Sequence, residues 1–180
     1  MAEIAGLTLI TPSSVAGSGV SLSGAKVTFT AATSVSVNGV FDGTHDNYLS
    51  VIQFTTSGGI NIRCRLRASG TDNSTASSYV SQFLGATSTT VYAGRNTNDR
   101  FQYFMSGYNT QRNGAHAYFY GPALAQPTAL RTVTALDLSS AYIEDGAGTH
   151  NQSTAYDGFS LLTLSATTMT GSLTVYGLSQ

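Results

Sequence analysis

The stretch INIRCRLRA, residues 60–68, alternates between apolar and polar side chains along its whole length. The apolar set is Ile60, Ile62, Cys64 and Leu66, and the polar set is Asn61, Arg63, Arg65 and Arg67. Successive side chains of a β-strand point to opposite faces, so a period of two is typical of a strand with one buried face. We therefore expect a strand over residues 60–68 that turns its arginines away from a hydrophobic core.

The segments on both sides of this strand are also β-like, because they are rich in β-branched and aromatic residues and show no helical periodicity. Many short strands separated by polar turns predict an all-β fold. We expect a single jelly-roll-like antiparallel β-sandwich of about eight to ten strands over residues 25–180. The further strands expected are 25–30, 34–37, 47–56, 78–84, 100–106, 115–120, 130–138, 158–164 and 172–177.

Glycine and small polar residues mark the connections between these strands. Ser57-Gly58-Gly59 separates two long strands and predicts a hairpin. Longer polar loops are expected at residues 69–74, 107–114 and 145–157. Asp145 and Gly146 are a pair typical of a chain reversal, and the acidic residues around them lack the spacing of a calcium-binding loop.

The composition combines a hydrophobic content of 41% with only 9% charged residues and a net charge of -1. An ordinary soluble domain carries about 25% charged residues. The hydrophobic content excludes intrinsic disorder, which needs few apolar residues and a high net charge. A surface with so little charge favours association, and we expect a homotrimer.

The same composition excludes several classes of partner. Eight basic residues, of which Lys26 is the only lysine, are too few for a nucleic-acid-binding stripe. No run approaches the roughly 18 apolar residues of a membrane span. The first residues, MAEIAGLTLITPSS, have neither the basic region nor the apolar core of a signal peptide. We expect neither a nucleic-acid nor a membrane partner, and synthesis in a cytoplasm.

The residues that could support catalysis or metal binding are few and scattered. The three histidines, His45, His116 and His150, lie in no recognisable nucleophile motif. Cys64 is the single cysteine, which excludes an internal disulfide and makes a zinc site a poor match. The sequence therefore predicts a protein that is not an enzyme, with no catalytic residue, metal ligand or cofactor.

Residues 1–24 look like an N-terminal arm followed by a linker. The apolar residues Ile4, Leu7, Leu9 and Ile10 come first, and residues 11–24, TPSSVAGSGVSLSG, are small and polar. Such a segment is either a loosely held terminus or an arm that becomes ordered on a partner. Apolar side chains are unusual on a free tail, which favours an arm that binds another protein.

The arginines of the 60–68 strand, Arg63, Arg65 and Arg67, project from one face. Arginine makes planar two-point bonds to carboxylates. We expect these side chains to pair with carboxylates on a neighbouring strand or at a subunit interface.

Tyrosines gather on two later strands. Tyr118 and Tyr120 share a strand face with His116, whereas Phe119 takes the opposite face. Together with Tyr103 and Tyr108, these tyrosines have two interpretations, packing in the core or between subunits, and binding of a receptor or glycan. Core or subunit packing is favoured, because aromatic residues dominate both environments.

Three stretches together resemble a group of tailed-bacteriophage virion proteins described as tail-fibre or head-decoration proteins. They are NGVFDGTHDNYLSVIQF (38–54), NIRCRLRASGTDNSTASSYVSQ (61–82) and STAYDGFSLLTLSATTMTGSLTVYGL (153–178). The resemblance covers about residues 35–178, with His45 where the group has Tyr and Leu49 where Arg is common.

The resemblance implies a trimeric β-sandwich displayed on a virion, with no enzymatic activity. Within this class we expect a head decoration (cement) protein that binds the major capsid protein or another virion protein, with the apolar residues of the arm making the contact. The alternative is a tail-fibre or receptor-binding protein that contacts host surface glycans. A chain of 180 residues favours decoration, because a tail fibre usually needs an attachment domain and a shaft as well.

Overall fold

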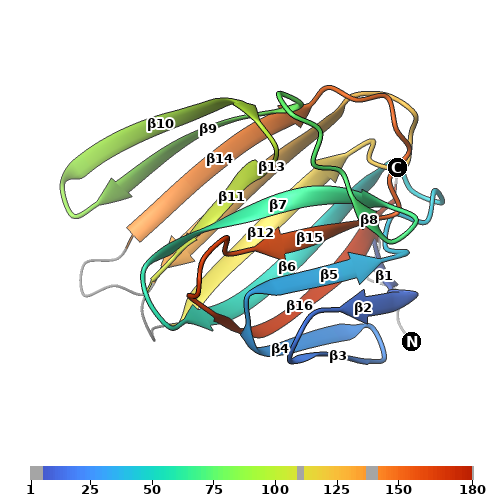
Figure 1. Ribbon diagram of the computed structural model, residues 1–180, viewed down its shortest axis with the longest axis horizontal. Coiled ribbons are helices and arrows are strands. Elements are labelled where there is room, and N and C mark those ends of the chain that lie inside the picture. Colours follow the sequence, from blue (N-terminus) through green and yellow to red (C-terminus); the bar gives the residue numbers. More distant parts are fainter. Residues whose placement is uncertain (1–5, 109–111, 137–141, 180) are drawn as a thin grey trace.

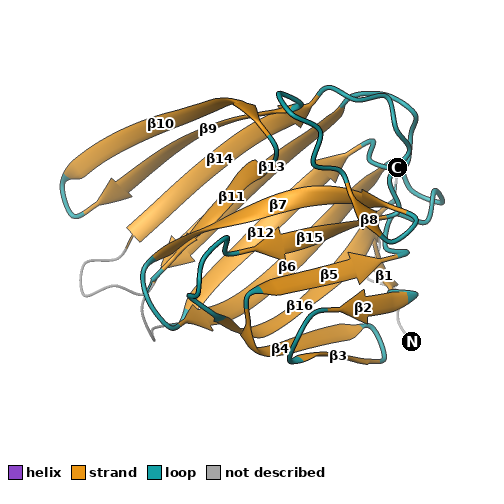
Figure 2. Ribbon diagram, in the orientation of Figure 1, coloured by secondary structure: helices purple, strands orange, loops and turns teal. Residues whose placement is uncertain are grey.

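The computed structural model describes residues 6–108, 112–136 and 142–179, which form sixteen strands in two antiparallel sheets (Figures 1 and 2). The prediction of an all-β sandwich is confirmed. The sheets have ten and six strands, more than the eight strands of a simple jelly roll.

The large sheet has the order β10-β9-β14-β13-β12-β6-β16-β4-β3, and β1 also pairs with β16. Its strands are β1 (Leu7–Ile10), β3 (Val20–Ser23), β4 (Lys26–Ala32), β6 (Asn47–Thr56), β9 (Tyr79–Thr87), β10 (Thr90–Asp99), β12 (Asn113–Tyr120), β13 (Thr128–Leu136), β14 (Tyr142–His150) and β16 (Met169–Leu178). In Figure 1 the hairpin of β9 and β10 lies at the opposite end of the molecule from β2–β4.

The small sheet has the order β11-β7-β15-β5-β2, and the short β8 pairs with β7. Its strands are β2 (Ser14–Ala16), β5 (Ser34–Asn38), β7 (Ile60–Ala68), β8 (Thr71–Asp72), β11 (Gln102–Gly107) and β15 (Gly158–Leu162). This sheet covers the central strands of the large sheet in Figure 1. Strands β6 and β7 belong to different sheets, so residues 57–59 carry the chain across the sandwich and the predicted hairpin there is wrong.

The core lies between the sheets and follows from the alternation in each strand. Ile62, Cys64 and Leu66 of β7 are almost fully buried, as the sequence predicts. They meet inward-facing residues of the large sheet, among them Phe119 of β12. The Phe119 ring lies 5.0 Å from the Phe159 ring of β15, a contact that joins the two sheets. Such aromatic contacts add to the free energy gained from apolar burial.

The segment expected to be a flexible arm is instead part of both sheets. β1 pairs with β16, β2 with β5, and β3 with β4. Its glycines allow tight reversals, since a Cβ at Gly19, where φ is +73°, would lie 2.1 Å from the carbonyl oxygen of Thr30. The prediction of an arm over residues 1–24 is therefore wrong for residues 7–23, and residues 1–5 lie outside the described part.

Besides β1 and β3, two more strands of the large sheet, β10 and β14, occupy segments where the sequence predicts none. Asp145 and Gly146 lie inside β14, so the predicted reversal is wrong, and the loop predicted over residues 145–157 is confined to residues 151–157. β10 forms a hairpin with β9, and β14 pairs with the other side of β9. Among the described strands, β10 pairs with β9 alone, so it forms one edge of the large sheet.

Candidate interaction surfaces

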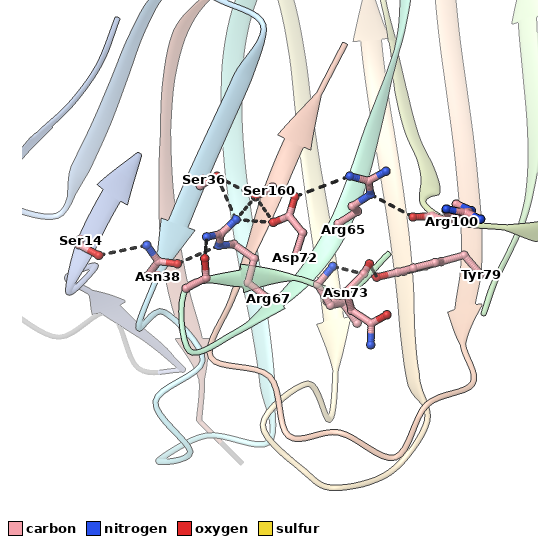
Figure 3. A network of polar contacts seen from close by, with 12 residues as sticks. Ser14, Ser36, Asn38, Arg65, Arg67, Asp72, Asn73, Tyr79, Arg100 and Ser160 are labelled. Atoms are coloured by element: carbon pink, nitrogen blue, oxygen red, sulfur yellow. Dashed lines mark hydrogen bonds and ion pairs between the residues drawn. The ribbon is translucent and has the colours of Figure 1, made fainter. Parts of the chain in front are cut away.

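The outer face of the small sheet carries a closed network of polar contacts centred on Arg67 (Figure 3). Its Nε donates to Asn38 Oδ1 at 2.8 Å and its Nη1 to Ser160 Oγ at 2.9 Å. The same guanidinium forms an ion pair with Asp72 of β8, which also accepts a 2.8 Å bond from Ser160. Arg67 is buried, and its charge is neutralised within the subunit.

Arg65 and Arg63, the other two arginines of β7, have different partners. Arg65 Nε donates to the Arg100 carbonyl at 3.0 Å, and its Nη1 lies 3.9 Å from Asp72. Arg63 lies 5.2 Å from the ring centres of Phe101 and Tyr103, and burial lowers the pKa of this guanidinium. Asp72 of β8 is therefore the carboxylate that the sequence analysis expected on a neighbouring strand. It forms ion pairs with Arg65 and Arg67. A role for the three arginines between subunits stays a prediction.

A buried carboxylate, Glu144 of β14, lies on the inner face of the large sheet, where its oxygens accept several hydrogen bonds. Ser106 N donates at 3.0 Å and the hydroxyls of Tyr92 and Tyr142 donate at 3.1 and 3.2 Å. The Tyr103 hydroxyl also donates to it, and burial together with this carboxylate raises the pKa of Tyr103. Sequence reasoning missed this cluster, because its segment was predicted to be a turn.

Tyr103 is 3% exposed, so it is a core residue and cannot be a receptor-binding aromatic of the free subunit. Its ring stacks on Phe83 of β9, with centroids 4.3 Å apart. Tyr108 follows β11 and is 47% exposed. Tyr118 and Tyr120 share the outer face of β12 in nearly parallel planes, whereas Phe119 is buried, as the alternation predicts.

His150 is the buried histidine. The Tyr156 hydroxyl is bonded to its Nε2, and its ring lies 4.1 Å from the Tyr79 ring. Burial lowers the pKa of His150 to about 4, so the imidazole is neutral at pH 7. The neutral ring therefore packs between Tyr79 of β9 and Tyr156 of the loop before β15, and it links these two segments to β14.

The outer face of the large sheet differs from these polar sites in carrying exposed aliphatic side chains. Leu84 of β9 is 55% exposed, Val91 of β10 is 68% exposed and Ile143 of β14 is 62% exposed. Val91 and Ile143 flank Ala86 from opposite sides, and Leu84 lies two residues further along β9. We call Leu84, Val91 and Ile143 the aliphatic ridge.

Beside the ridge, where β9 and β14 continue next to β13 and the end of β12, the outer face of the large sheet has a hollow. The hollow has a volume of about 410 Å³, and small residues such as Ala129 and Ala147 line it beside Tyr120. We call it the apolar hollow; its lining is Val80, Ser81, Gln82, Tyr120, Ala129, Leu130, Arg131, Ala147, Gly148 and Thr149.

The apolar residues of the expected arm do not form one surface. Ile10 is buried in the core, whereas Leu9 is 49% exposed on β1. Leu7 is partly buried and pairs with Leu178, and Ile4 lies outside the described residues. A role for these residues in capsid binding stays a prediction. Leu7, Leu9 and Ile10 would act from strand β1 of the sandwich and not from a free arm.

Within the described residues, no three His, Cys, Asp or Glu side chains are grouped to hold a metal ion. No helix of the described chain is long and apolar enough to cross a bilayer. The chain matches no protein-family model and no curated protein.

Proposed function

We propose that this protein is a non-enzymatic structural component of a tailed-bacteriophage virion, a homotrimeric head decoration protein that binds and stabilises the capsid surface. The resemblance of three stretches to virion proteins supports the class. The observation that carries the proposal is the aliphatic ridge, an apolar surface that a single subunit leaves in water.

Exposed aliphatic side chains are common singly, but a contiguous patch indicates an interaction site. The three ridge residues lie on adjacent strands and are each more than half exposed. Within the described residues, the outer edge of β10 pairs with no other strand, and β10 contains neither lysine nor proline, two residues that discourage pairing at edges. Both features favour a protein whose large sheet is covered in an assembly.

The alternative function is that of a tail protein that binds host glycans. The parallel rings of Tyr118 and Tyr120 favour it, because aromatic faces stack on sugar rings. The two functions differ in how many copies each particle carries. Decoration requires hundreds of copies, whereas a tail protein is present in a handful.

Quantitative mass spectrometry of purified particles tests the proposal, with the major capsid protein as the internal standard. Copy numbers in the hundreds are expected, together with a trimer by sedimentation at micromolar concentration. A handful of copies per particle would favour the tail function. A species of 18.7 kDa at all concentrations would contradict the trimer.

A further inference from the structure

We propose that the free edge of β10 receives an extended segment of a virion partner as an added antiparallel strand, with an acidic residue opposite Arg95 and an aliphatic residue opposite Val91. This inference rests on the proposed function, because it names the kind of segment that the subunit binds in the particle. In strand addition, main-chain hydrogen bonds provide affinity and alternate side chains provide specificity. Figure 1 shows β10 at one end of the large sheet, on the opposite side from β3.

The edge of β10 is regular enough to pair with another strand. Its pairing with β9 runs without a bulge from Thr90 to Asn96, and the register shifts only between Asn96 and Asp99. Natural edges resist pairing through bulges, lysine and proline, and residues 90–96 contain none of these. This run is as long as an ordinary strand, about 5–6 residues. The edge can therefore bind a whole added strand.

The outward side chains of this edge determine the chemistry of the added strand. Val91, Ala93 and Arg95 alternate along β10, and all three are exposed. Val91 belongs to the aliphatic ridge, so an aliphatic side chain opposite it would remove apolar surface from water. Ala93 is small and leaves room for a larger side chain opposite it.

Arg95 provides the charge selectivity. Among the described residues no carboxylate forms an ion pair with Arg95, unlike Arg67 and Arg131. Opposite charges that face each other across two strands are favourable, whereas like charges are unfavourable. The partner strand should therefore carry Asp or Glu opposite Arg95. Because antiparallel strands run in opposite directions, this acidic residue comes four positions before the aliphatic residue that faces Val91.

A second copy of this chain does not provide such a strand. If β10 paired with itself, a register that set Val91 against Val91 would overlap only at residues 90–92. A register that set Arg95 against Asp99 would overlap only at residues 95–99 and would leave Val91 unpaired. The other edge strands of the described sheets, β2, β3 and β11, contain no acidic residue. The edge therefore fits a foreign segment better than a copy of this chain.

Fluorescence anisotropy with the labelled peptide TETYTVT tests the added strand. In the antiparallel register, its Glu faces Arg95, its Tyr faces Ala93 and its Val faces Val91. We expect saturable binding to the wild type and at least about tenfold weaker binding to Val91→Lys, which introduces a lysine that resists edge pairing. The matched control is Val51→Lys on β6, a 44% exposed outward position of a strand paired on both sides, which should bind like the wild type.

Two N-methylated forms of the peptide distinguish strand addition from docking of side chains alone. Methylation of alternate backbone nitrogens blocks one edge of the peptide, and the two forms block opposite edges. Only one edge can face β10 while Glu, Tyr and Val point outward. One form should therefore bind like the parent peptide, and the other should not bind.

A charge exchange tests the position of the acidic residue. Arg95→Glu should bind TETYTVT about fivefold more weakly than the wild type does, because two carboxylates then face each other. The same variant should prefer the peptide TRTYTVT, in which arginine replaces the acidic residue. Equal preferences of the two proteins would contradict the pairing with Arg95.

The outcomes separate this inference from the proposed function. No saturable binding of TETYTVT by the folded wild type, or equal binding of both N-methylated forms, would overturn the added strand and leave the proposed function standing. Assembly of the wild type that Val91→Lys abolishes in sedimentation would assign the edge to a second copy and also overturn the inference. A handful of copies in each purified particle would contradict the proposed function and leave the peptide result unchanged.

Discussion

The two outer faces of this sandwich have opposite chemistry. On the small sheet, Arg67 is buried, and the side chains of Asp72 and Ser160 satisfy its hydrogen-bonding groups. On the large sheet, Val91 and Ile143 stand more than half exposed. The first face pairs its central charge within the chain, whereas the second leaves apolar surface in water. This difference identifies the large sheet as the face where an assembly gains most from burial.

Arginine–aspartate ion pairs lie on both faces, and the Arg67–Asp72 pair of the small sheet differs in environment from the Arg131–Asp145 pair of the large sheet. The Arg67 side chain is 9% exposed, whereas those of Arg131 and Asp145 are 55% and 47% exposed. Buried ion pairs are costly to break because one charge is left without a partner, whereas exposed pairs exchange readily with water. The same pair of residue types should therefore contribute very differently to the stability of the two faces.

The largest effect is expected from deleting residues 1–24, which removes a strand from the small sheet and two from the large one. The deletion takes away Ile10, Val15, Val20 and Leu22, which pack on the core. A fully buried side chain contributes roughly 1.5–3 kcal/mol; Ile10 is buried and the other three are partly buried, and the hydrogen bonds of three strands are lost as well. Their sum is comparable to the whole free energy of unfolding of a domain, about 5–15 kcal/mol.

We therefore expect the truncated chain to show no cooperative unfolding and no near-ultraviolet circular dichroism signal from its tyrosines. Deletion of residues 1–5 is the control, because it removes none of β1–β3. A folded trimer without residues 1–24 would show that these strands are dispensable and would restore the arm interpretation.

The next largest effect is expected from Arg67→Ala, which breaks the network on the small sheet. It removes the hydrogen bonds of the buried guanidinium and leaves Asp72 with only the more distant Arg65 and the Ser160 hydroxyl, a loss of about 1–3 kcal/mol. Urea unfolding at pH 7 measures this as a lower midpoint. Arg65→Ala on the same strand is the matched control and should cost less, because Arg65 lies 3.9 Å from the same carboxylate. Equal losses for both variants would contradict the central place of Arg67.

The sequence predicts the core strands well, because their alternation reflects burial. In β7, Ile62 and Leu66 face the core, and in β12 Phe119 is buried between the outward Tyr118 and Tyr120. The carboxylate partner expected for the arginines is present as Asp72, but its position on a short strand five residues after Arg67 could not be derived from periodicity.

The sequence could not predict β14 because its alternation is the reverse of the usual one. Glu144 and His150 face inward, whereas Ile143 faces water. The inward carboxylate is tolerated because hydroxyls from other strands, among them that of Tyr103, donate to it. These donors are distant in the sequence, and the aliphatic Ile143 side chain is 62% exposed, so the local pattern does not indicate a strand with one buried apolar face. Strands β2 and β3 were missed for another reason, since short strands with small side chains resemble a linker.

The free energy of unfolding should depend on pH through His150, which lies on the inner face of β14. Burial lowers the pKa of His150 from 6.5 to about 4, so between these values the unfolded chain binds more protons than the folded one. Stability is then fully present above about pH 6.5 and falls as the pH is lowered toward 4, by roughly 2 kcal/mol. Urea unfolding at pH 7 and 4.5 measures the loss.

His150→Gln should reduce this pH-dependent loss, whereas His116→Gln, on the outer face of the same sheet, should retain it. An identical loss in all three proteins would assign the pH dependence to other groups.

The smallest effect is expected from Arg131→Ala, the counterpart of Arg67→Ala on the large sheet. Hydrogen bonds from Arg131 hold the pKa of Asp145 below its usual value, but both side chains remain in contact with water. Water can replace the lost partner, so the urea midpoint should not change measurably at protein concentrations where the subunit is monomeric. Asp145→Ala should behave in the same way, and the double variant should show no coupling between the two positions. A loss as large as that of Arg67→Ala would mean that the outer face of the large sheet is already covered in the isolated protein, and the contrast between the two faces would then fail.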